Sequence, residues 1–133
     1  MKRNFLSLFA LLLAALMLTA CNGKSIKISA DDNGSTVSMK TGETLYISID
    51  GNPTTGYTWE VDSVDQNILK LAGEPEYSPD SNLNPKKTGV GGTYKFKFTP
   101  VSTGATTLKL KYWRTFEPDN PPIETFEVEV NVE

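Results

Sequence analysis

The sequence predicts an all-β domain built as a sandwich of two sheets, and three observations support that prediction. After residue 25, apolar and polar residues alternate with a period of two, which is the pattern of strands with one buried face. The same region shows no sustained helical period of apolar residues, so helices are not expected. Turn-forming residues recur about every ten residues, a spacing typical of β-sandwiches.

The first half of the domain contains five predicted strands, each with apolar residues at alternate positions. They cover 26–28, 37–39, 44–50, 57–61 and 68–71. The turn Asp-Asp-Asn-Gly at 31–34 is of the hairpin type, so we expect it to join the first two strands as a hairpin. Residues 78–88 form a polar stretch longer than a compact sandwich needs, and such loops tend to be functional or mobile.

Three more strands are predicted in the second half, at 94–98, 108–112 and 126–132, which gives about seven to eight strands in all. The last two should form a hairpin. On its outer face Lys109 and Lys111 are expected to oppose Glu127 and Glu129. Such a charge ladder is worth at most about 1 kcal/mol per pair, so its expected role is to set register and solubility.

The first 20 residues have the features of a leader that is removed from the mature protein. Lys2 and Arg3 make a basic start, and 5–18 is an apolar run broken only by Ser7. This run is too short to span a membrane comfortably. The sequence Leu-Thr-Ala-Cys at 18–21 resembles a bacterial lipobox, in which the cysteine is acylated before cleavage.

These features divide the chain into a lipoprotein signal peptide at 1–20, a lipidated N-terminus with a short tether at 21–25, and the β-sandwich domain at 26–133. The lipid is expected on Cys21, the single cysteine, so the mature domain has no disulfide and its stability must come from packing. The alternative is a plain secretory signal followed by a free cysteine. The predicted location is the bacterial cell envelope, on the outer membrane or cell surface, with the periplasmic face as an alternative.

Charge and residue content exclude several classes of function. The chain has 13 basic and 16 acidic residues, and two of the basic ones, Lys2 and Arg3, lie in the leader, so the mature domain has a net charge of −5. This charge argues against nucleic acid and against electrostatic attraction to anionic lipid. Because the chain has no histidine, a Ser–His or Cys–His nucleophile and a histidine metal site are excluded. We expect the carboxylates to be solvated surface, and we predict no catalytic residue, metal or cofactor.

The most constrained stretch of the domain is the uncharged turn Asn-Pro-Thr-Thr-Gly-Tyr that begins at residue 52. Pro53 fixes its own φ and disfavours a helical Asn52, whose side-chain amide can bond back to nearby backbone. Gly56 supplies the positive φ that lets the chain re-enter a strand. Thr54 and Thr55 are β-branched and stiff, so we expect their hydroxyls to be held out for binding.

Two later turns accompany this one. Gly-Val-Gly-Gly occupies 89–92, and Arg-Thr-Phe occupies 114–116. On the predicted strand count, the three turns are separated by even numbers of strands. Because alternate turns of such a sandwich fall at the same end, we expect all three to form a single binding edge.

Together the three turns resemble the loops of the chagasin family, the I42 class of cysteine peptidase inhibitors. That family is marked by an NPTTG-aromatic loop, a GxGG loop and an R-P-aromatic loop on an immunoglobulin-like domain. The first two motifs are complete here, whereas the third departs from the pattern, with Thr115 in the proline position and Phe116 where tryptophan is commoner. The resemblance implies an immunoglobulin-like β-sandwich that is not an enzyme.

The resemblance also implies a mode of binding. It implies reversible inhibition of papain-family cysteine peptidases by a monomer that wedges three loops into the active-site cleft. Thr54 and Thr55 would lie over the catalytic Cys–His pair. The 89–92 loop would run along the unprimed side of the cleft, and Arg114 and Phe116 would contact the primed side. The residues expected to contact the peptidase are Asn52, Pro53, Thr54, Thr55, Gly56, Tyr57, Gly89, Val90, Gly91, Gly92, Arg114, Thr115 and Phe116.

Other interpretations are open for each loop and for the whole domain. The glycine-rich turn also fits a flexible loop end, Arg114 is placed to pair with Glu117 or Glu124, and Phe116 is placed to pack under the proline-rich loop at 118–122. The alternative function is a non-inhibitory cell-surface adhesion or ligand-binding lipoprotein, which would use the same loop edge. The sequence names neither the target peptidase nor its origin.

Overall fold

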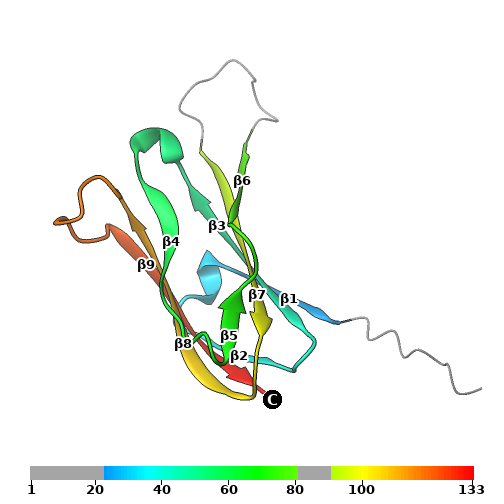
Figure 1. Cartoon of the computed structure of the whole chain (residues 1–133). Coiled ribbons are helices and arrows are strands. Elements are labelled where there is room, and N and C mark those ends of the chain that lie inside the picture. The colour runs from blue at the N-terminus through cyan, green and yellow to red at the C-terminus, as the bar shows by residue number, and fades with distance from the viewer. Residues whose placement is uncertain (1–22, 81–90) are drawn as a thin grey trace, which may run out of the picture.

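The computed structural model describes residues 23–80 and 91–133, and Figure 1 shows that they form two packed β-sheets. The strands are β1 (Ser25–Ser29), β2 (Thr36–Met39), β3 (Thr44–Gly51), β4 (Thr58–Ser63), β5 (Leu69–Leu71), β6 (Glu76–Pro79), β7 (Gly92–Pro100), β8 (Gly104–Trp113) and β9 (Glu124–Val132). Two short 3-10 helices, η1 (Ala30–Asp32) and η2 (Pro53–Thr55), lie between strands. The all-β prediction is confirmed, with nine strands in the described ranges. No helix in these ranges is long and apolar enough to cross a membrane.

The strands divide between a first sheet, in the order β1-β3-β7-β5 with β6 also paired to β7, and a second sheet, in the order β2-β9-β8-β4. β1 is parallel to β3 and β2 is parallel to β9. The first two strands therefore belong to different sheets, and the hairpin predicted at 31–34 is wrong. The chain crosses between the sheets through η1 instead, where the Asp32 carboxylate accepts the Ser29 backbone N–H at 2.8 Å and closes a tight turn.

Strand β6 is not among the predicted strands, and its second half, Ser78 and Pro79, lies in the stretch predicted to be a loop. Tyr77 supplies the apolar contact of this strand, because its ring centroid lies 4.9 Å from that of Tyr94 on β7. A strand with a single large apolar residue does not produce a recognisable alternation, so the sequence does not reveal it. The remainder of the predicted polar loop, 81–88, lies outside the described residues.

β5 and β6 are two halves of one edge strand. Both run antiparallel to β7. Leu71 pairs with Phe98 and Glu76 pairs with Lys95, so five residues on the β5–β6 side span the same length as three residues of β7. The two extra residues form a bulge that interrupts the pairing. Because both halves run in the same direction, the additional strand leaves the predicted placement of the loops unchanged.

The core fills the space between the inward faces of the two sheets. In β7, Tyr94, Phe96 and Phe98 are buried, while Lys95 and Lys97 between them are exposed. The largest fully buried side chains come from both sheets and are Leu45, Ile47, Leu69, Phe96 and Phe98 from the first, and Met39, Leu108, Leu110, Phe126, Val128 and Val130 from the second. Each such side chain contributes about 1.5–3 kcal/mol through burial, so the core holds the sheet ends and their loops in place.

The predicted charge ladder on the outer face of β8 and β9 is half right. Lys109 lies opposite Glu127, and the two form an ion pair at 3.0 Å. Lys111 instead lies opposite Thr125 and pairs with Asp62 of β4 at 3.5 Å. The core sets this register, because Leu110 and Phe126 must both face inward as a pair.

Candidate functional site

The described parts of the three turns singled out in the sequence lie at one end of the sandwich, toward the top and upper left of Figure 1. Strand pairing accounts for this arrangement. In the first sheet, Gly51 at the end of β3 pairs with Gly92 at the start of β7. In the second sheet, Thr58 at the start of β4 pairs with Trp113 at the end of β8. Gly89 and Val90 of the second turn lie outside the described residues. The described parts of all three turns therefore share one edge.

The first turn is locked by its own hydrogen bonds. The Asn52 side-chain oxygen accepts from the Thr54 N–H at 3.2 Å and from the Thr54 hydroxyl at 2.6 Å. The Thr55 hydroxyl donates to the Asn52 carbonyl at 2.6 Å, and Gly56 has the predicted positive φ, +84°. The prediction of outward-held hydroxyls is therefore wrong: both hydroxyl protons are used inside the turn. Thr54 and Thr55 are exposed, and their hydroxyl oxygens keep acceptor capacity.

Aromatic residues of the second sheet support the first turn from below. The Tyr112 hydroxyl accepts the Asn52 backbone N–H at 2.8 Å, and the Tyr112 ring lies 5.5 Å from the ring of Tyr57 and 5.0 Å from that of Trp59. The Trp59 indole N–H donates to the Asp50 carbonyl at 2.9 Å. Sequence reasoning identified these aromatics as strand residues and missed this role, because Tyr112 is 60 residues from its partner.

Arg114 joins the third turn to the first. Its Nη2 donates to the Thr55 carbonyl at 3.0 Å, and its guanidinium lies 4.4 Å from the centre of the Tyr57 ring. Its Nη1 pairs with Glu117 at 3.3 Å. Of the two alternative partners, Glu117 forms the ion pair with Arg114, but the same guanidinium also bonds to the first turn, which no local sequence pattern indicates.

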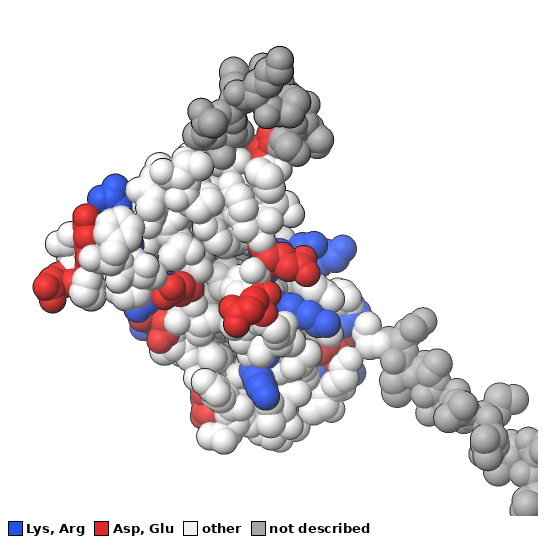
Figure 2. All heavy atoms as spheres, turned by 45° about the horizontal axis from the view of Figure 1, so that its top comes forward, with Lys and Arg blue, Asp and Glu red and all other residues white. Residues whose placement is uncertain are grey.

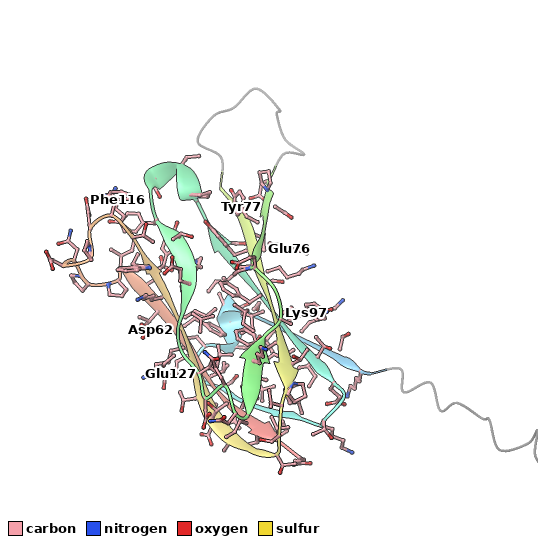
Figure 3. All side chains as sticks on the ribbon, in the orientation of Figure 1. Asp62, Glu76, Tyr77, Lys97, Phe116 and Glu127 are labelled. Atoms are coloured by element: carbon pink, nitrogen blue, oxygen red, sulfur yellow. The ribbon has the colours of Figure 1, made fainter. Side chains whose placement is uncertain are left out.

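Phe116 is 66% exposed and lies beside the first turn, as Figure 3 shows. A Cβ built on Gly56 would come within 2.9 Å of the Phe116 ring, so the two loops pack closely. The alternative that Phe116 packs under the 118–122 loop is therefore wrong. An exposed aromatic side chain held beside a basic one is the composition typical of binding hot spots.

The second turn begins from a tightly packed hairpin of β6 and β7. A Cβ on Gly92 would lie 2.7 Å from Tyr77 Oη and would also overlap the Ser78 carbonyl, and the Gly91 carbonyl accepts from Asp80 N–H at 3.0 Å. Glycine is thus required at 92 by close packing. Partial burial, with the neighbouring Tyr94 and Asp80, raises the pKa of Tyr77 above that of a free phenol.

The composition of this edge suits contact with another protein. The described ranges contain no group of three His, Cys, Asp or Glu side chains able to hold a metal ion. The exposed tip residues Pro53, Thr54 and Thr55 carry no charge, and the aromatic Phe116 stands next to them. An uncharged, rigid tip can be buried without the cost of desolvating an unpaired ion.

Comparison with known proteins identifies relatives over nearly the whole described domain. Amoebiasin-1 of Entamoeba histolytica is 37% identical over 108 residues, which cover 81% of this chain and 100% of the relative. Chagasin of Trypanosoma cruzi is 29% identical over 109 residues, which cover 78% of this chain and 94% of chagasin.

Solved structures share the fold. The crystal structure of the cysteine protease inhibitor EhICP2 from Entamoeba histolytica matches with a TM-score of 0.74 at 19% identity, covering 84% of this chain and 98% of that one. PbICP-C, whose structure is a complex with falcipain-2, matches with a TM-score of 0.58 at 20% identity, covering 84% of this chain and 100% of that one. The model of the chagasin family peptidase inhibitor I42 matches residues 38–130. This chain therefore belongs to the chagasin family of I42 peptidase inhibitors.

Proposed function

We propose that this protein reversibly inhibits papain-family cysteine peptidases by filling the active-site cleft with its three loops. The observation that carries the proposal is the bond from Arg114 to the Thr55 carbonyl, together with the packing of Phe116 on Gly56. These contacts make the first and third turns one rigid surface. A surface that is ordered before binding loses little conformational entropy on association, which favours tight binding.

In this proposal Thr54 and Thr55 lie over the catalytic Cys–His pair. The tip is uncharged, and its hydroxyl oxygens remain available as acceptors, which suits a protonated imidazole. Asn52, Pro53, Gly56 and Tyr57 hold the shape of this tip. A stiff turn need not present its peptide bonds in attack geometry, so it blocks the site without being cleaved.

The flanking turns extend the contact along the cleft. The loop Gly89, Val90, Gly91 and Gly92 would lie on the unprimed side, where small residues permit close approach of two backbones. Arg114, Thr115 and Phe116 would lie on the primed side, with Phe116 as the apolar anchor. Target peptidases are then ones with an open, extended substrate groove.

The test is titration of a chain starting at Gly23 against papain and cathepsin-like peptidases. The double variant Thr54→Glu, Thr55→Glu should lose inhibition by about a hundredfold or more, because two carboxylates would be buried against the catalytic pair. A matched control is Thr41→Glu, Thr103→Glu, which places the same charges on exposed threonines in turns at the opposite end of the sandwich. The control should inhibit like the unchanged protein.

Two results would refute the assignment. If the double variant inhibits like the unchanged protein, the first turn is not part of the peptidase-binding site. Absence of inhibition against several such peptidases would favour the adhesion or ligand-binding alternative, which uses the same edge.

We further propose that residues 1–20 are a lipoprotein signal peptide, that Cys21 is acylated, and that the monomeric domain is tethered to the bacterial cell envelope through 21–25. The lipobox-like sequence at 18–21 supports this. Expression of the full chain and of Cys21→Ser in a bacterial host, followed by detergent phase partitioning, tests it. The unchanged chain should enter the detergent phase, and the variant should be retained as a precursor without the acyl mass.

A further inference from the structure

Lysine side chains gather on the outer face of the first sheet. Lys27 on β1, Lys70 on β5, and Lys95 and Lys97 on β7 are exposed, and each follows or precedes buried apolar residues in its strand. All four therefore point away from the core. None of them forms an ion pair within the described ranges.

Acidic residues are few on this face. Glu76 lies opposite Lys95 in the register, and Asp50 lies at the loop end of β3, where it accepts the Thr93 hydroxyl at 3.2 Å. The outer face of the second sheet has the reverse balance, with Glu60, Asp62, Glu127 and Glu129 against Lys109 and Lys111.

The labelled side chains in Figure 3 illustrate this separation of charge, with Glu76 as an acidic residue on the lysine side. Figure 3 places Lys97 on one side of the sandwich and Asp62 and Glu127 on the other. In Figure 2 blue atoms lie on the side where the described chain begins, and red atoms stand beside some of them. The net charge of the domain hides this separation, because it averages two faces of opposite sign.

The lysine face is also shaped to hold anionic groups. Ser25, Lys27, Tyr46, Ser48 and Lys95 line a shallow hollow on it. Serine and tyrosine hydroxyls can donate hydrogen bonds, and the two ammonium groups supply charge, so the hollow offers what a phosphodiester oxygen accepts.

The point at which the chain enters the sandwich lies on this sheet. The Lys24 carbonyl accepts the Thr44 N–H at 3.0 Å, so the chain is held against β3 from Lys24 onward. Cys21 precedes Lys24 by three residues, and three extended residues span about 10 Å at most. A lipid on Cys21 would therefore hold the start of β1, and Lys27 with it, close to the phospholipid headgroups.

We propose that the outer face of the first sheet docks on an anionic phospholipid surface. The proposed lipid at Cys21 would set the orientation of the domain on the membrane, whereas the lysine face would supply the affinity. The acidic outer face lies on the far side of two sheets that are about 10 Å apart, so its repulsion with the membrane is weaker than the attraction of the nearer lysines. Because Ser25 pairs with Thr44 at the start of β3 and the first turn follows its end at Gly51, the described parts of the loops lie at the end away from the anchor.

Vesicle cosedimentation of a chain starting at Gly23, which contains all nine described strands and lacks Cys21, tests the docking directly. It should bind phosphatidylcholine vesicles that contain phosphatidylglycerol, bind pure phosphatidylcholine vesicles far less, and lose binding as salt is raised. Lys95→Gln, Lys97→Gln should lower the partition coefficient by about tenfold or more. Lys109→Gln, Lys111→Gln removes the same charge from the second sheet and should leave the coefficient unchanged.

Three results would overturn the docking: no binding to the anionic vesicles, equal binding to both vesicle types, or equal losses in the two double variants. Binding to heparin without binding to vesicles would assign the face to another polyanion. Peptidase titration of the same proteins separates the two proposals. A protein that inhibits the peptidases but does not bind anionic vesicles refutes the docking alone. A protein that binds the vesicles but does not inhibit the peptidases refutes the proposed inhibition alone.

Discussion

Thr54 and Thr55 form a tip whose hydroxyl protons are already used within the loop. Both donate at 2.6 Å, one to the Asn52 side chain and the other to the Asn52 carbonyl. The asparagine and the threonines thus order one another, and Pro53 fixes the backbone between them. A partner therefore meets a rigid tip with hydroxyl acceptors. Because the two threonine side chains are already ordered in the free protein, little rotamer entropy is lost on binding.

Thr115 takes the place of the proline in the third motif, and its position in the turn is one that proline favours. It lies at the second position of a turn closed by the Glu117 N–H and the Arg114 carbonyl at 3.1 Å, and its own N–H donates to no described residue. Proline is favoured at that position. Thr115→Pro should stabilise the loop by about 0.4–1 kcal/mol and tighten inhibition by less than tenfold. Inhibition constants measured beside Thr115→Ala check this, and unchanged or weaker inhibition by the proline variant would contradict it.

Gly56 serves the site as well as the backbone, and a matched glycine separates the two roles. Gly56 and Gly34 have φ values of +84° and +82°, but only a Cβ on Gly56 meets a neighbour, the Phe116 ring at 2.9 Å. Alanine at either position should lower stability by about 1–2 kcal/mol in thermal or urea unfolding. Only Gly56→Ala should also weaken inhibition, by about five- to tenfold, because it displaces Phe116. Equal inhibition by the two variants would rule out this role.

At the scale of elements, β8 carries both the support of the first turn and the start of the third. Tyr112 is buried near its end and accepts the Asn52 N–H, and two residues later Arg114 bonds to Thr55. One strand therefore positions two loops, and a shift of β8 would displace both. The strand is itself paired with β9 and β4 on either side, so the second sheet sets the position from which both loops are held.

Tyr112→Phe tests this coupling. It removes the acceptor of a partly buried N–H, which should destabilise the protein by about 1–3 kcal/mol and weaken inhibition. Tyr94→Phe is the matched control, because Tyr94 is equally buried, at 7% against 8% exposed, and its hydroxyl bonds to no described residue. Urea unfolding and inhibition assays should show a near-neutral control. Similar losses in both variants would show that ring packing, not the hydrogen bond, supports the loop.

At the scale of the whole molecule, the proposed functions are divided between one end of the sandwich and one of its faces. The loops occupy one end, the chain enters β1 near the other, and the two outer faces differ in charge. The sandwich that carries these features has no disulfide, since the single cysteine precedes it, so its stability comes from packing.

Stability should therefore be independent of redox conditions. The thermal midpoint of a chain starting at Gly23 should be the same with and without a reducing agent, because a domain without cysteine has no disulfide to lose. Calorimetry in both buffers checks this, with one cooperative transition expected for a single core. A midpoint lowered by the reductant would contradict it.

The sequence by itself determined which residues face the core and which three turns share an end. Alternation is a local property of a strand, so Leu45, Phe96 and Val128 were identifiable as buried without any knowledge of their partners. The three loops together indicated the family, and the first motif was the most specific of them, because it is contiguous in the chain and complete. Alternation did not reveal β6, since Tyr77 is the single large apolar residue of that strand.

Only the tertiary structure decided which strands pair and what the loop residues contact. Alternation assigns a face but not a neighbour, so β1 and β2 were expected in one hairpin although they lie in different sheets. The bond from Arg114 to Thr55 spans 59 residues, and the lysine face collects residues from three strands. Such contacts depend on the register and order of strands, which the packing of the whole core selects and no single segment encodes.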